Sequence, residues 1–163
     1  MRIFRTSLFT AVALAVLALP GTAAAAVSSA YSIRGIEIAA TSTQGTFVGE
    51  GTGAAGDHAG WRATVVHQQL SSSCLTSSTG CAITGGTFEL VNDQLDVLRG
   101  AFTGGGVRLL SQEAGCGVQR FRVTGSVLTP LGLGSFDVVL THHRVSFFGC
   151  RTVGADVVGT FTP

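Results

Sequence analysis

The clearest pattern of hydrophobic and polar positions along the chain is an alternation with a period of two residues. In GVQRFRVTGSVLT, the residues Phe121, Val123 and Val127 share one face of an extended chain, and Arg, Thr and Ser residues lie between them. The segment TVGADVVGTFTP repeats the alternation, with Ala155 and Phe161 on the apolar side. This pattern predicts half-buried β-strands.

The other segments, read in the same way, give about eight or nine strands joined by short, glycine-rich links. They span 31–39, 44–53, 60–70, 83–91, 95–103, 105–111, 118–128, 132–148 and 152–162. In VNDQLDVLRG we favour a hairpin turn at Asn92 and Asp93 over a single helical turn. We therefore predict an all-β fold, an antiparallel meander that closes into a small barrel of about eight strands, and favour it over a sandwich because closure removes exposed edges.

The first 26 residues follow a different pattern. The basic start MRIFR precedes the apolar run LFTAVALAVLAL, and the small-residue segment PGTAAAAV follows. This order is typical of a secretory signal peptide, and the run is shorter than the roughly 20 residues of a spanning helix. We predict a signal peptide at 1–26, one barrel domain at 27–163, and a secreted or extracytoplasmic protein, possible envelope attachment included. No stable membrane insertion is expected after cleavage.

All four cysteines fall in the predicted mature part: Cys74, Cys81, Cys116 and Cys150. An even number of cysteines in an exported chain indicates disulfides. Three pairings are possible, and proximity in the sequence favours Cys74–Cys81, which leaves Cys116–Cys150. No C-x-x-C pair and no close Cys–His spacing supports zinc, so we predict no metal and no cofactor.

Charge and composition exclude several classes of function. The net charge of the whole chain is +1, and removal of Arg2 and Arg5 leaves 8 Arg against 9 Asp and Glu. These arginines are scattered, so no nucleic-acid partner is expected. The absence of lysine excludes a Schiff-base or phosphate-binding lysine. One Tyr and one Trp do not make the aromatic girdles of an outer-membrane barrel, which favours a soluble one.

One glycine motif resembles a nucleotide-binding fingerprint. The segment GTGAAG at 51–56 matches G-x-G-x-x-G, but DHAGW follows it and indicates a turn and a strand rather than a helix. We interpret these glycines as strand-end and hairpin residues.

The histidines are the candidates for polar contacts with a ligand. His67 shares a strand face with Trp61, Ala63 and Val65, and we predict that this face lies inside the barrel. His58 lies in a glycine-flanked turn, where we expect it to face solvent.

The stretch LTHHRVSFFGC allows two interpretations. Unbroken alternation from Leu140 brings His142 and Arg144 into the lumen. A β-bulge near His142 and His143 would instead turn Val145 and Phe147 inward, and His143 could then face inward or lie at the rim. Both interpretations stay open.

Histidine and arginine inside a barrel require an acidic partner, a ligand or water. Glu37 and Glu50 on the early strands are the candidate acids, although we expect both to face solvent. Histidine can act as an acid or base near neutral pH, and arginine can hold a carboxylate or enolate oxygen. The ligand-binding candidates are therefore His67, His142, Arg144 and Trp61; no catalytic residue is assigned.

Four segments together resemble small exported bacterial proteins of the allene-oxide-cyclase and dirigent barrel type: FVGEGTGAAGDHAGW, CAITGGTFEL, LRGAFTGGGV and GSFDVVLTHHRV. The resemblance covers about residues 31–162 and consists mostly of glycine patterns. It implies an antiparallel barrel of about eight strands with an apolar lumen. It also implies that small apolar molecules are steered or cyclised there without a cofactor. No functional residue of that group matches one by one, so none is carried across.

Three functions are compatible with these features. The first is a secreted barrel that binds a small, mainly apolar molecule in its lumen. The second is a cofactor-free cyclase or isomerase that uses the same cavity. The third is an envelope or interaction protein with a filled core. An open lumen with an inward histidine would favour the first two.

Overall fold

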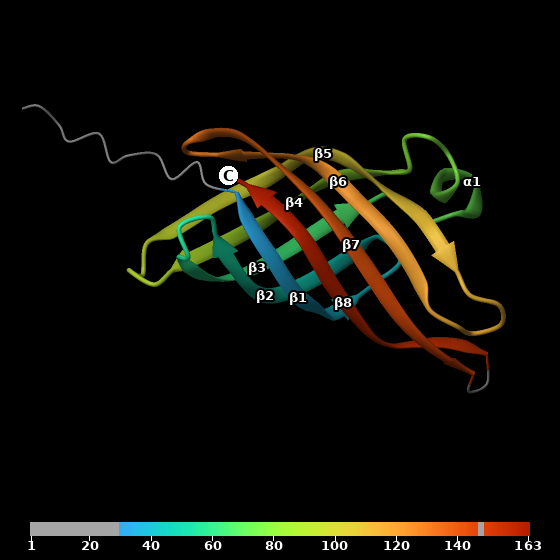
Figure 1. Cartoon of the computed structure of the whole chain (residues 1–163). Helices are drawn as coiled ribbons and strands as arrows, with labels where there is room; N and C mark the ends of the chain where they lie inside the picture. Colours follow the sequence, from blue (N-terminus) through green and yellow to red (C-terminus); the bar gives the residue numbers. More distant parts are fainter. Residues whose placement is uncertain (1–29, 147–148) are drawn as a thin grey trace, which may run out of the picture.

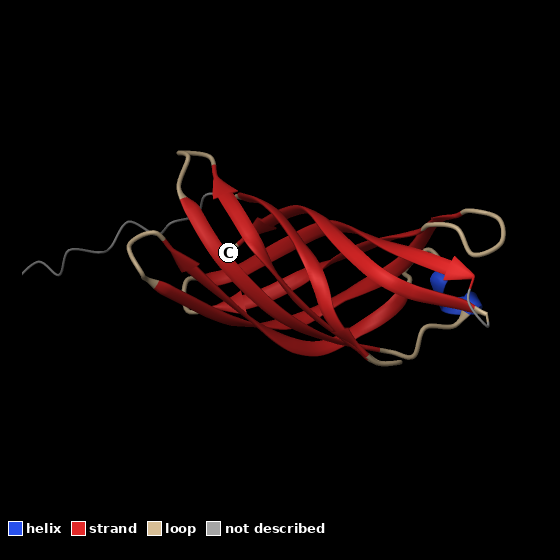
Figure 2. Ribbon diagram, turned by 90° about the horizontal axis from the view of Figure 1, so that it is seen from below, coloured by secondary structure: helices blue, strands red, loops and turns tan. Residues whose placement is uncertain are grey.

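The barrel predicted from the alternation is confirmed by a computed structural model, which describes residues 30–146 and 149–163. The predicted signal peptide at 1–26 lies outside the described residues. Each strand pairs antiparallel with its neighbour in sequence, and β8 pairs with β1 to close the sheet (Figures 1 and 2). The strands are β1 (Tyr31–Ala40), β2 (Gln44–Gly53), β3 (His58–His67), β4 (Cys81–Asn92), β5 (Val97–Gln112), β6 (Gln119–Thr129), β7 (Gly132–Ser146) and β8 (Cys150–Thr162).

Two elements differ from the prediction. The two predicted strands at 95–103 and 105–111 are one strand, β5. The glycines at 104–106 cause a register shift between Phe102 and Gly104 but do not end the strand. A four-residue helix, α1 (Ser72–Leu75), lies in the cysteine loop, and the Ser71 side chain caps it by accepting a hydrogen bond from the Cys74 backbone N–H. No helix in the described part of the chain is long and apolar enough to cross a membrane.

The two ends of the barrel carry different features. At the disulfide end, which we define by the last residues of β1, β3, β5 and β7 and the first residues of β2, β4, β6 and β8, lie α1 and both disulfides. At the opposite, terminal end, the described chain begins at β1 and ends after β8 (Figure 1). The disulfides join Cys74 to Cys81 and Cys116 to Cys150, which confirms the favoured pairing.

The two faces of the sheet separate apolar from charged side chains. Phe121, Val123 and Val127 are buried in the lumen, as their alternation predicts. The outer face carries cross-strand ion pairs, for example Arg34 with Glu50. Outward ion pairs between neighbouring strands help to fix the register.

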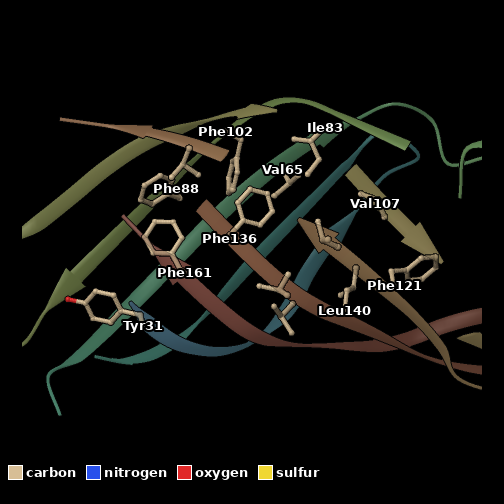
Figure 3. Packing of buried hydrophobic residues seen from close by; sticks show 14 of the residues in the cluster. Tyr31, Val65, Ile83, Phe88, Phe102, Val107, Phe121, Phe136, Leu140 and Phe161 are labelled. Carbon is tan, nitrogen blue, oxygen red and sulfur yellow. The ribbon is translucent and has the colours of Figure 1, made fainter. Parts of the chain in front are cut away.

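Phenylalanines close the middle of the lumen. We call Phe88, Phe102, Phe136 and Phe161 the phenylalanine layer (Figure 3). Their rings meet edge to face, with centroids 4.8 Å apart for Phe88–Phe161 and 5.2 Å apart for Phe102–Phe136. This geometry matches the favourable arrangement of aromatic quadrupoles.

Glycines make room for the large rings. The ring of Trp61 lies over Gly35 and Gly49 of the adjoining strands, where an added Cβ would come within 2.6 Å and 2.7 Å of Trp61 Cζ2. The indole N–H of Trp61 donates a hydrogen bond of 3.0 Å to the Glu50 carbonyl oxygen. The close approach therefore requires glycine at both positions.

Replacement of Gly49 by alanine is expected to lower the free energy of unfolding by about 1–3 kcal/mol, because the new methyl group overlaps the Arg34 carbonyl oxygen and the Trp61 ring. Gly60→Ala is the matched control, since a Cβ at this position meets nothing within 4 Å. Urea denaturation of both variants measures the difference. Equal stability of the two variants would show that Trp61 does not depend on the glycine.

Removal of the disulfides should destabilise the barrel in proportion to the loops that they close. The Cys116–Cys150 bond closes 34 residues and the Cys74–Cys81 bond closes 7. Loop-closure entropy predicts losses of about 4 and about 2.5 kcal/mol for the two double Cys→Ser variants, measured by denaturation. A larger loss for the short loop would contradict this ranking.

Candidate functional site

A cavity of about 130 Å³ lies in the lumen, lined by the phenylalanine layer and by residues towards the disulfide end. Its walls are mostly valine, leucine and phenylalanine side chains, and its lining reaches Thr41 and Gln44 at the turn between β1 and β2 and Leu70 in the segment after β3. An engineered cavity of about 150 Å³ with similar walls stays dry and binds benzene. The space therefore suits one small apolar molecule.

The structure places Trp61 and His67 in the cavity wall, on the inner face predicted for them. His67 Nδ1 lies 2.8 Å from the Gln68 carbonyl oxygen. A carbonyl can only accept, so Nδ1 carries a proton, and in the neutral ring Nε2 is left as an acceptor. His58, in contrast, is exposed, as expected.

His142 also lines the cavity, because the alternation along β7 continues unbroken from Leu140. The bulge interpretation, which placed the extra residue at His142 and His143, is wrong. The register shift lies on the partner strand: His143 pairs with Gly154 and Arg144 with Thr152, so β8 carries the extra residue.

Glu37 points into the cavity, contrary to the expectation that it faces solvent. Its side chain is only 9% exposed, and its Oε2 lies 3.1 Å from Nε2 of His142, whose side chain is 17% exposed. Although the two atoms are close, His142 Nε2 is buried and has no hydrogen-bond partner among the described residues. Glu50, the other candidate acid, does face solvent.

Arg144 and His143 do not line the cavity. Arg144 lies two residues beyond His142, towards the end of β7, and its Nη1 is buried without a hydrogen-bond partner among the described residues. His143 is on the outer face, where its Nε2 lies 2.7 Å from Asp156 Oδ2. Of the four ligand-binding candidates, Trp61, His67 and His142 therefore line the cavity and Arg144 does not.

The arrangement gives a mainly apolar chamber that contains the Glu37–His142 pair. The ring of His142 packs edge to face against Phe121, with centroids 5.2 Å apart, which fixes the direction of its nitrogens. Gly45 leaves room for the acid, since a Cβ there would lie 2.7 Å from Glu37 Oε1. Such a site can bury the apolar part of a molecule and orient a single polar group.

Within residues 30–146 and 149–163, no three His, Cys, Asp or Glu side chains are grouped as metal ligands. Comparison of the chain with family models, with curated proteins and with solved structures found no match.

Replacement of Glu37 by leucine is expected to stabilise the free protein by about 1–3 kcal/mol, because the carboxylate is only 9% exposed and accepts no hydrogen bond from the described residues, which is costly. Glu50→Leu, on the outer face, is the control and should not stabilise, since it removes the ion pair with Arg34. Chemical denaturation provides the measurement. Destabilisation by Glu37→Leu beyond that of the control would mean that the carboxylate is satisfied in the fold.

Proposed function

We propose that the protein binds one small, mainly apolar molecule in its lumen. The observation that carries the proposal is the cavity of about 130 Å³ in the lumen, whose lining is mainly apolar and includes a few polar residues, among them Glu37, His67 and His142. Barrels of about eight strands either fill their interior with side chains or hold one small ligand. The cavity counts against the filled core of a purely structural protein.

We further propose that the protein acts outside the cytoplasm. The two disulfides are typical of proteins that fold in an oxidising compartment. The signal-peptide pattern at 1–26 supports the same location.

A cofactor-free cyclase or isomerase is the second candidate, and the contact between Glu37 and His142 favours it. A carboxylate beside an imidazole in an apolar chamber is a suitable acid–base pair. The resemblance to the allene-oxide-cyclase and dirigent barrel type points in the same direction. Native mass spectrometry of the exported protein distinguishes binding from catalysis. A single co-purified molecule that is released chemically unchanged supports binding, and a substrate–product pair supports catalysis.

Filling the cavity tests the main proposal. Ala63 lines the cavity, so Ala63→Leu should place a larger side chain in the ligand's space and weaken binding of methylcyclohexane at least about tenfold. The fluorescence of Trp61, the single tryptophan, reports binding from within the cavity wall.

Thr64→Leu is the control, because Thr64 follows Ala63 in β3 and its side chain therefore points to the outer face. This variant should bind methylcyclohexane with the affinity of the unaltered protein. Equal affinities for the Ala63 and Thr64 variants would place the ligand outside the lumen, and absence of binding to the unaltered protein would refute the proposal.

A further inference from the structure

The polar pair in the cavity lacks the hydrogen bonds that buried groups normally have. Within the described part of the chain, no N–H or O–H donates a hydrogen bond to the Glu37 carboxylate, although the side chain is only 9% exposed. Among the described residues, the facing Nε2 of His142 has no hydrogen-bond partner either. A buried polar atom without a partner destabilises the protein, so a ligand group that hydrogen-bonds to this pair would be favoured.

The charges define what that group must be. Two acceptors 3.1 Å apart would repel each other, so a proton lies on one of them; with Glu37 as the carboxylate, that proton is on His142 Nε2. A ligand group that fits this pair donates to Glu37 and accepts from His142. A carbonyl or ether oxygen only accepts, an ammonium only donates, and a carboxylate would be repelled by Glu37.

We propose that the ligand is a neutral, one-ring alcohol whose hydroxyl donates to Glu37 and accepts from Nε2–H of His142. This inference rests on the proposed binding function. The ring would lie on the phenylalanine layer, between the valine and leucine walls, and the hydroxyl would point towards the disulfide end. A cavity of about 130 Å³ matches a single six-membered ring, as the benzene-binding cavity shows.

Four cyclohexane derivatives of nearly equal shape test the hydroxyl without any change to the protein. Methylcyclohexane has no polar group, cyclohexanone only accepts, cyclohexylamine is a cation, and cyclohexanol both donates and accepts. Titration of the oxidised mature protein, followed by Trp61 fluorescence, should give cyclohexanol the highest affinity, about tenfold or more above cyclohexanone. Tighter binding of cyclohexanone or cyclohexylamine would overturn the proposal.

Two variants test whether Glu37 causes the preference for cyclohexanol. Glu37→Leu should weaken cyclohexanol binding about tenfold or more and leave methylcyclohexane within about twofold of the unaltered protein. Glu50→Leu, on the outer face of β2, should change neither affinity. If both ligands lose affinity equally in Glu37→Leu, the carboxylate only shapes the cavity and the proposal fails.

Different results would refute the proposed ligand class and the proposed binding function. Binding of methylcyclohexane without preference for cyclohexanol would leave the lumen as the binding site and refute the alcohol. Absence of binding by all four compounds would refute the proposed function together with its ligand class. If Glu37→Leu does not fold, the comparison of cyclohexanol with cyclohexanone on the unaltered protein still decides the question.

Discussion

The fit of large aromatic rings over glycine backbone is the constraint on which the rest of the structure depends. A closed barrel of about eight strands has a lumen only wide enough for side chains, so a tryptophan needs adjoining positions without a Cβ. Gly35 and Gly49 provide that space for Trp61, and Gly125 provides it for Phe136, where a Cβ would lie 2.7 Å from the ring. The glycines therefore determine where aromatic bulk fills the lumen.

The position of the cavity follows from where the large aromatic side chains lie. The phenylalanine layer fills the middle of the lumen, and smaller side chains such as Val65 and Val123 line the wall towards the disulfide end. Strand ends fray more readily than strand centres, and the two disulfides restrain the end beside the cavity.

The sequence was sufficient to predict the barrel, the disulfide pairing and the inward faces of His67 and Trp61, because strict alternation and cysteine spacing are local signals. The sequence-based expectation that Glu37 faces solvent was wrong. Ile36 and Ile38 beside it suggest an inward apolar face, yet they are 50% and 56% exposed, because the glycine under Trp61 fixes the other face of β1 inward. The local pattern left a bulge at the histidines open as one of two interpretations; the extra residue lies on β8, and its position depends on strand pairing that the local pattern does not contain.

Xenon binding tests the central claim, an open apolar space inside the barrel, most directly. A crystal of the oxidised mature protein under xenon pressure should show one xenon atom in the lumen, bounded by Val65, Val123 and Leu140, because dry apolar cavities take up this gas. A lumen without xenon, in which those side chains touch one another, would contradict the claim and leave a filled barrel.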